Sequence, residues 1–427
     1  MATILTTSTP LDSISSPLEL SRGGRWAVLV AAFLGLMFDG FELGLMPVAS
    51  LSVTQDLLGN DYTNALGGKW FAWFTAALML GAAIGGSLLG NLGDRVGRAR
   101  AMGISILFYS LFAGMGAFVT SLEQMLLLRF LVGLGVGGMW PNGVALVAEC
   151  WSTASKPTVS GILGAGINVG VLALSQLVRF EEITPESWRW IFMLSAIPAL
   201  LGVMVLTLLP ESPKWLAFRG AGKQAAPRLS EMFRGDLLRP TVIGILLASV
   251  PLIGAWAGSK WVIPWADKLG EAAGEPGYKA ATQGWWALGA TIGSFVGSPI
   301  AAFVGRRLSY FLISLGATLL TWGMFRLTAP LEPNFLYVVF AQGLVATLFF
   351  GWLPLYLPEL FPLRVRATGA GLSMNIGRFA TAAGVLSSGA LFTYFGNHYS
   401  AIGAACALVY ATGMIVILWS PTTDREM

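Results

Sequence analysis

The segment GNLGDRVGRAR, at residues 90–100, joins two long apolar stretches of the chain. A weaker copy, SPIAAFVGRR, joins two further apolar stretches at residues 298–307. Gly97 and Gly305 align in the two copies, and Glu149 and Glu359, near the ends of later apolar stretches, repeat with nearly the same offset. A charged, glycine-bearing hairpin that recurs once in the same orientation indicates a duplicated membrane protein with parallel repeats.

The composition supports this interpretation. The chain has 427 residues, of which 55% are hydrophobic and 11% are charged, and its mean hydropathy is +0.70. So much apolar surface cannot be buried in one water-soluble core, and a helix needs about 20 apolar residues to cross a bilayer. We therefore predict an all-α membrane protein with twelve transmembrane helices in two six-helix bundles. The predicted spans are 26–50, 70–91, 101–120, 124–148, 158–180, 190–209, 240–262, 283–304, 308–327, 334–357, 367–395 and 400–419.

The spans divide the chain into two bundles and three polar segments. Lys and Arg are concentrated in the loops on one side, which is expected to be cytoplasmic. Both termini are then cytoplasmic, in the inner membrane if the source is bacterial. The first segment has no pattern of a removable signal peptide. The predicted parts are an N-terminal tail (1–25), a first bundle (26–209), a linker (210–239), a second bundle (240–419) and a C-terminal tail (420–427).

Several classes of function do not fit this sequence. The net charge of +4 is spread over short loops beside the spans, which is typical of membrane topology and not of nucleic-acid binding. Two cysteines, Cys150 and Cys406, are too few for a disulfide framework. The sequence contains neither a phosphate-binding P-loop nor a cluster with metal-ligand spacing. We therefore expect no cofactor, no metal site and no enzyme.

Several motifs resemble those of one superfamily. The hairpin is similar to G-x-L-x-D-R-x-G-R-x-R, and RFLVGLGVGG, which begins at Arg129, is similar to R-x-x-x-G-x-G-x-G; both are motifs of the major facilitator superfamily. The string PESPKWL, at 210–216, resembles one that follows the sixth helix in sugar porters and organic-ion carriers. The strings FDGFE (38–42), MWPN (139–142), RATG (366–369) and NIGR (375–378) together resemble the aromatic-acid and metabolite proton symporters of that superfamily.

The resemblance implies two helical bundles that rock about a midplane cavity and open it alternately to each side. It also implies a network of ion pairs that closes the cytoplasmic side and breaks when the cavity opens inward. A plainer interpretation is that the basic members only follow the insertion rule for cytoplasmic loops. The residues that match this network are Asp94, Arg98, Arg100, Glu149, Glu359, Arg364 and Arg366.

Four ionisable residues lie more than two residues inside the ends of the predicted spans, where a charge costs about 2.5–3.5 kcal/mol or more and normally faces a cavity or a partner. They are Asp39, Glu42, Arg129 and Arg378. Asp39 and Glu42 share a helix face, so their protonation is expected to be coupled. Alternatively, one of the two carboxylates forms a static ion pair with Arg129. The resemblance links Arg129 to proton coupling or to substrate access, whereas a long side chain near a helix end can also extend to the interface.

Arg378 is the predicted holder of the substrate. Its planar guanidinium can bind a carboxylate through two hydrogen bonds, and Asn375, on the same helix face, can add a donor. The alternative is a permanent ion pair between Arg378 and Asp39 or Glu42. We expect no other central charge in the second half. Further candidates for the cavity wall are Trp140, Asn142, Asn168, Gln176, Trp256, Gln342, Trp352 and Tyr356.

Together these features predict secondary active transport, in which protons drive uptake of a small organic anion. The anion is expected to be an aromatic or sugar-derived carboxylate. Asp39, Glu42 and Arg129 would handle the proton, and Arg378 would bind the substrate. The expected partners are the substrate, protons and the lipid bilayer, with no nucleic acid, and the protein is expected to be a monomer. The alternatives are a neutral-sugar porter or facilitator, and a receptor or enzyme built on the same membrane scaffold.

Overall fold

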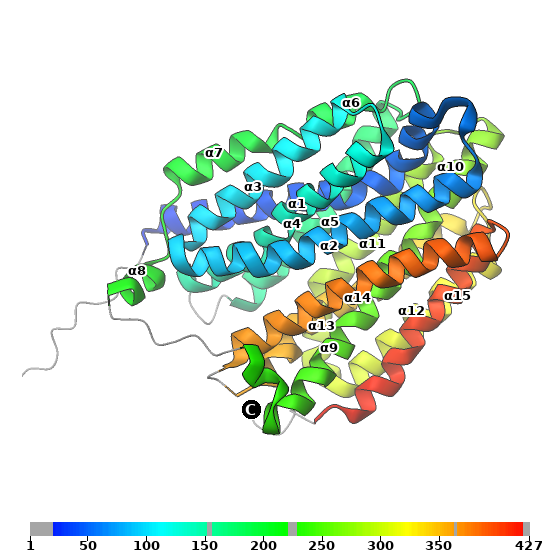
Figure 1. The fold of residues 1–427 in the computed structure, drawn as a ribbon. Helices are drawn as coiled ribbons and strands as arrows, with labels where there is room; N and C mark the ends of the chain where they lie inside the picture. Colours follow the sequence, from blue (N-terminus) through cyan, green and yellow to red (C-terminus); the bar gives the residue numbers. More distant parts are fainter. Residues whose placement is uncertain (1–19, 152–155, 221–228, 363–364, 422–427) are drawn as a thin grey trace, which may run out of the picture.

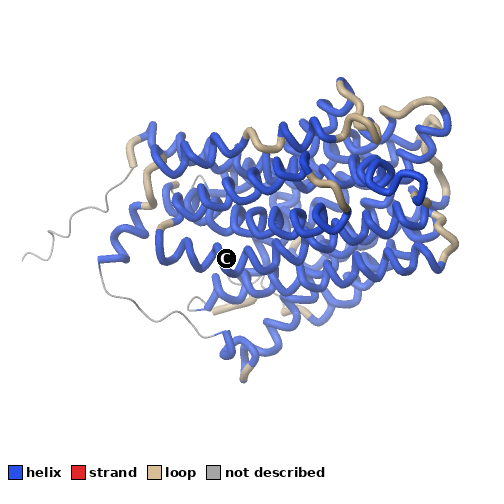
Figure 2. The backbone as a smooth tube through the Cα atoms, turned by 45° about the horizontal axis from the view of Figure 1, so that its top comes forward, coloured by secondary structure: helices blue, strands red, loops and turns tan. Residues whose placement is uncertain are grey.

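The computed structural model describes residues 20–151, 156–220, 229–362 and 365–421. All regular structure in these ranges is helical, which confirms the predicted all-α class (Figure 2). The α-helices are α1 (Arg22–Leu58), α2 (Asn64–Val96), α3 (Arg98–Met115), α4 (Leu122–Cys150), α5 (Lys156–Phe180), α6 (Arg189–Leu194), α7 (Pro198–Leu208), α8 (Pro213–Gly220), α9 (Leu238–Ile253), α10 (Val262–Ala273), α11 (Tyr278–Val304), α12 (Arg306–Arg326), α13 (Phe335–Glu359), α14 (Arg366–Tyr394) and α15 (Tyr399–Val416).

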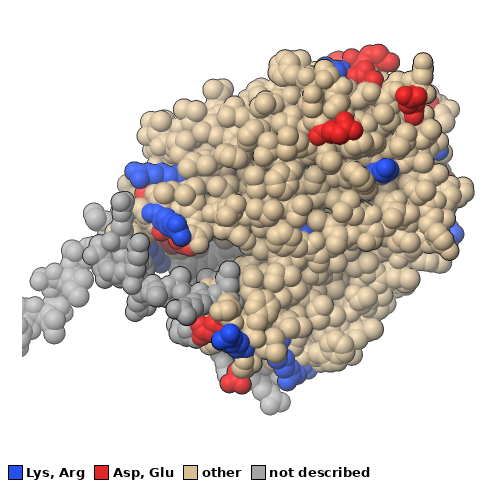
Figure 3. Space-filling model, viewed as in Figure 1, with Lys and Arg blue, Asp and Glu red and all other residues tan. Residues whose placement is uncertain are grey.

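The long helices form two groups that follow the two halves of the chain (Figure 1). One group holds α1 to α7 and the other α9 to α15, and the groups meet where α2 packs on α14 and α5 packs on α11. On the face shown in Figure 3, charged side chains lie mainly near the two ends of the molecule. This distribution is typical of a membrane protein, whose middle faces lipid.

Eleven helical segments of the described residues are long and apolar enough to cross a membrane. The helix α14 is not among them, although it coincides with the predicted span 367–395 and has 29 residues. The count of twelve spans and their division into two bundles of six therefore stay predictions.

Both copies of the hairpin adopt the same backbone turn. Gly97 ends α2 with φ of 117°, and Gly305 ends α11 with φ of 95°. Side chains with a Cβ rarely adopt such positive φ values, so glycine fits both positions. In each copy the next residue, Arg98 or Arg306, begins a new helix. The repeat seen in the sequence is therefore also a repeat of local structure.

The seventh predicted span, 240–262, ends too early. After α9 the chain forms a π-helical turn (Gly254–Gly258) and a 3₁₀ turn (Ser259–Trp261), and then continues as α10 to Ala273. Pro251 removes a backbone donor within α9, and π-helical turns accommodate such breaks. One consequence is that Lys260, which the predicted bounds place two residues from the end of the span, lies well inside the helical segment. A smaller difference is the sixth span, which is broken into α6 and α7 just before Pro198.

Candidate functional site

A central cavity of about 130 Å³ lies between the two groups of helices. It adjoins a second cavity of about 360 Å³, because Trp140, Phe350 and Arg378 line both. The central cavity is lined by Asp39, Leu43, Met79, Ala82, Val136, Trp140, Gly164, Ile167, Asn168, Val171, Leu252, Ala255, Trp256, Lys260, Trp286, Ser294, Thr347, Phe350 and Arg378. Its charged lining residues are thus one acid and two bases, from both halves of the chain.

Asp39 and Glu42 lie in different surroundings, although both are 2% exposed. Nη1 of Arg129 is 3.3 Å from Oε2 of Glu42, and Nη2 of the same arginine donates to the Glu42 carboxylate and main-chain carbonyl. Asp39 lines the cavity, and its Oδ1 has no hydrogen-bond partner among the described residues. Glu42 therefore forms the buried ion pair with Arg129, and Asp39 is the acid that lines the cavity.

The Glu42–Arg129 pair should stabilise the packing of α1 on α4. Removing one partner of a buried ion pair leaves an uncompensated charge, at a cost of about 3–5 kcal/mol. We expect Glu42→Gln to lower the free energy of unfolding by this order, measured as loss of thermal stability of the purified protein in detergent. The double variant Glu42→Gln with Arg129→Met should be more stable than Glu42→Gln alone. If the double variant loses as much thermal stability as the two single variants together, the two residues do not act as a pair.

Arg378 reaches the first half of the chain from α14. Its Nη1 donates to the main-chain carbonyl of Ala82 at 3.4 Å, and Nδ2 of Asn375 donates to Oγ of Ser87 at 3.2 Å. Both side chains pass α2 at Gly86, where a Cβ would lie 3.0 Å from Nη1 of Arg378. No ion pair of Arg378 with Asp39 or Glu42 occurs in the described part of the chain. Arg378 is thus placed at the junction of the two cavities with a backbone contact.

Lys260 is a central charge that the sequence reasoning missed, since no second-half charge other than Arg378 was expected there. The residue is 2% exposed, and its Nζ lies 3.5 Å from the ring centroid of Trp286 and 5.8 Å from that of Trp256. Within the described residues Nζ has no hydrogen-bond partner. The predicted span ends at residue 262, so Lys260 was expected near the outer surface of the membrane. A predicted span that continued to Ala273 would have placed Lys260 well inside the membrane.

Three other predicted wall residues, Trp140, Asn168 and Trp256, line the central cavity, and Asn375 lines the second one. Nδ2 of Asn168 donates to Oγ of Ser294 at 2.8 Å, which joins α5 to α11 across the two halves. The cavity wall thus combines indole rings with an amide that bridges the halves.

Five predicted wall residues, Gln176 among them, lie elsewhere and line neither cavity. Gln342 is one layer behind the wall, where its Oε1 accepts a hydrogen bond from the indole of Trp286 at 2.8 Å. Asn142 donates to the Leu89 carbonyl and joins α4 to α2. Trp352 and Tyr356 are fully buried in the core of the second half. The apolar sequence of α13 indicated their depth but not which way they face.

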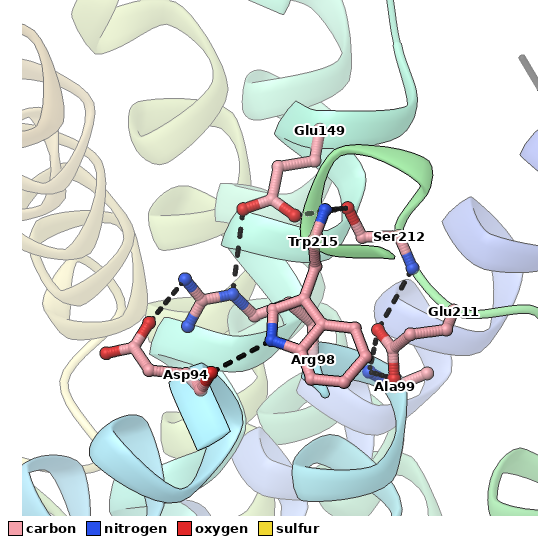
Figure 4. A network of polar contacts seen from close by, with 7 residues as sticks. All are labelled: Asp94, Arg98, Ala99, Glu149, Glu211, Ser212 and Trp215. Atoms are coloured by element: carbon pink, nitrogen blue, oxygen red, sulfur yellow. Dashed lines mark hydrogen bonds and ion pairs between the residues drawn. The ribbon is translucent and has the colours of Figure 1, made fainter. Parts of the chain in front are cut away.

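Three of the four predicted gate residues of the first half, Asp94, Arg98 and Glu149, form one network around the hairpin 90–100 (Figure 4). Nη2 of Arg98 is 2.6 Å from Oδ1 of Asp94, and Nε of Arg98 is 3.6 Å from Oε1 of Glu149. The network therefore ties together α2, α3 and α4 within one half.

The motif PESPKWL docks onto this network (Figure 4). Glu211 accepts a hydrogen bond from the Ala99 amide at the start of α3, where the helix dipole favours an anion. Ser212 donates to Glu149, and the indole of Trp215 donates to the Asp94 carbonyl at 2.9 Å. The beginning of the predicted linker is thus fixed to the first half.

The second half repeats part of this arrangement. Nη2 of Arg306 is 3.0 Å from Oε1 of Glu359, as Arg98 approaches Glu149 in the first half. Arg100 is exposed and lies outside the contacts drawn in Figure 4. Arg364 falls outside the described residues, and of Arg366 only the backbone, at the start of α14, is described. The two networks define what we call the hairpin end of the molecule.

The opposite end is tied together across the two halves. Nζ of Lys279 is 3.0 Å from Oδ1 of Asp267, and both side chains are 1% exposed. The same Nζ donates to the main-chain carbonyl of Ile183, in the first half, at 2.9 Å. Phe71 also packs edge-on against Trp261, 5.0 Å between ring centroids. The second cavity, by contrast, extends toward the hairpin end, since Ala148 and Pro358 line it.

Three comparisons with known proteins agree with this arrangement. The family model described as "Sugar (and other) transporter" matches residues 27–240. The chain is 32% identical to the "Probable 4-methylmuconolactone transporter" of Cupriavidus pinatubonensis, over 92% of this chain and 90% of that protein. It is 28% identical to the "Cis,cis-muconate transport protein" of Acinetobacter baylyi, over 88% and 92%. The crystal structure of a D-xylose-proton symporter superposes with a TM-score of 0.73 at 17% identity, over 94% and 99%, and so has the same fold.

Proposed function

This chain belongs to the sugar (and other) transporter family of the major facilitator superfamily and is a multi-pass membrane transporter, and we propose that it is a proton-coupled symporter of a small organic anion. The Acinetobacter baylyi relative named above supports the substrate class, because its name specifies muconate, a carboxylate. In this proposal Arg378 binds the anion, Asp39 carries the proton, and the cavity is open at the hairpin end.

The observation that carries the proposal is that Asp39 and Arg378 line one buried cavity. A buried charge is stable only when it is paired or hydrogen-bonded. Arg378 donates to a main-chain carbonyl there through Nη1. A guanidinium has five N–H donors, so that of Arg378 can also bind a carboxylate by two parallel hydrogen bonds. Asn375, which lines the second cavity beside Arg378, lies on the substrate's path toward it.

We assign the proton to Asp39 and not to Glu42. Glu42 is neutralised by Arg129, so a proton bound there would break an existing ion pair. Oδ1 of Asp39 has no hydrogen-bond partner among the described residues, and Asp39 lines the same cavity as the substrate arginine. When Asp39 is protonated, Arg378 keeps its full attraction for the anion. Proton and anion are therefore expected to bind together.

We also propose that the structure corresponds to the state open at the hairpin end. The Lys279–Asp267 pair and the Ile183 contact tie the halves at the opposite end, whereas the second cavity leads from Arg378 toward the hairpins. The excess of Lys and Arg near the hairpins makes that end cytoplasmic. In this state Asp94, Arg98 and Glu149 stay within one half. Their proposed role as a gate then requires them to pair across the halves only when the cavity opens outward.

Transport into proteoliposomes under an imposed pH gradient, alkaline inside, tests the proposed function. We expect saturable accumulation of at least one acid among labelled benzoate, gluconate and terephthalate, which a protonophore abolishes. Liposomes without protein are the control, because protonated benzoate crosses bilayers unaided. Accumulation of D-xylose instead of the acids would favour the neutral-sugar alternative. If no solute accumulates above the protein-free control, the proposal is wrong.

A further inference from the structure

Lys260 is the one buried base of the central cavity that the proposed function leaves unused. Its Nζ has no hydrogen-bond partner among the described residues, and the centroids of two indole rings lie 3.5 Å and 5.8 Å from it. An ammonium over an indole face gains about 0.5–2 kcal/mol. A buried ammonium normally also needs an anion, because desolvation costs several kcal/mol per ion. None of the described residues supplies that anion to Nζ.

The charges of the cavity specify what the missing anion must be. Asp39, Lys260 and Arg378 together give one negative and two positive charges. Proton-coupled binding makes Asp39 neutral, which leaves two uncompensated positive charges in a site of low dielectric constant. A monocarboxylate would neutralise only one of them. A substrate with two carboxylates neutralises both, so the loaded, protonated cavity has no net charge.

We propose that Lys260 is a second anion-binding residue and that the preferred substrate is a planar dicarboxylate, held by Arg378 at one end and by Lys260 at the other. This inference rests on the proposed function and narrows its substrate class. The two bases come from different elements, the 3₁₀ turn before α10 and the helix α14, so they can bind separate carboxylates. Trp140, Trp256 and Trp286 line the space with flat apolar rings, which suit an aromatic or conjugated spacer.

Binding of matched acids to the detergent-purified protein, measured by calorimetry, tests the inference. Benzoate with terephthalate and crotonate with fumarate are pairs that differ by one carboxylate on a planar frame. We expect the dicarboxylate of at least one pair to bind about 10–100-fold more tightly, as charge-assisted hydrogen bonds require. Lys260→Met should remove this preference and change binding of the monocarboxylate by less than about threefold. Lys260→Arg, which keeps the charge, should retain the preference.

The matched control is Lys268→Met, which changes another lysine of the same segment that does not line the cavity. It should bind both acids as the unaltered protein does. Equal binding of the two acids of each pair, or an equal loss of both in Lys260→Met, would overturn the role of Lys260 and leave the proposed function standing. Binding of D-xylose without binding of any acid would overturn both.

Discussion

Replacing Arg378 by alanine should abolish uptake of the organic anion while the protein still folds and reaches the membrane. Arg378 lies at the junction of the two cavities, and its contact with the first half, to the Ala82 carbonyl, is long at 3.4 Å. The variant therefore loses one long hydrogen bond and no ion pair to a described residue. Truncating one partner of a buried charge pair weakens binding on the order of 100-fold or more. The measurement is the dissociation constant of the transported acid, beside its initial rate of uptake.

Two further variants make this test specific. Arg378→Lys keeps the charge but loses the planar fork, so binding should fall between that of the unaltered protein and that of the alanine variant. Arg326→Ala removes an exposed arginine at the end of α12 and should leave binding unchanged. Unchanged uptake by Arg378→Ala would show that the arginine has a structural role and that another group holds the anion.

The all-α fold and the candidate charges in the first half were predictable from the sequence. Asp39, Glu42 and Arg129 stand out because ionisable residues are costly within apolar stretches. The sequence left open which acid Arg129 contacts, because residues three apart on one helix face are equally placed for a partner. The structure resolves this through α4, which brings Arg129 to Glu42 and leaves Asp39 in the cavity. Only the packing of separate helices distinguishes the two acids.

Two parts of the site could not be predicted, for different physical reasons. Hydropathy locates a residue along a helix but not around it when the helix is apolar on every side, as α13 is. Trp352 and Tyr356 were therefore predicted to face the cavity, whereas their polar atoms donate to the carbonyls of Arg306 and Pro421. Lys260 was missed because the predicted span ends at residue 262: the π-helical and 3₁₀ turns through which the chain continues to Ala273 have no periodic signature in sequence. The residue that adds the second positive charge thus lies in an irregular stretch of its span.

Replacing Asp39 by asparagine should uncouple anion movement from the pH gradient. Asparagine is always neutral and close in shape to the protonated acid, so the anion can still bind and cross. With the membrane potential clamped at zero, coupling to one proton sustains about tenfold accumulation per pH unit, since a tenfold ratio equals about 1.4 kcal/mol. We expect that ratio for the unaltered protein and a ratio near one for Asp39→Asn. Counterflow of labelled anion against an unlabelled internal pool should persist in the variant.

The contrast with Glu42 makes the result informative about mechanism. Asp61→Asn, an exposed acid in the short turn after α1, is the matched control and should accumulate anion normally. Glu42→Gln should lose thermal stability, because it leaves Arg129 unpaired. The fraction of this variant that still folds should accumulate anion in response to the pH gradient. If Asp39→Asn accumulates anion normally and Glu42→Gln does not, the proton site is Glu42. Protonation would then release Arg129, and coupling would work through the packing of α1 on α4 instead of through the charge of the cavity.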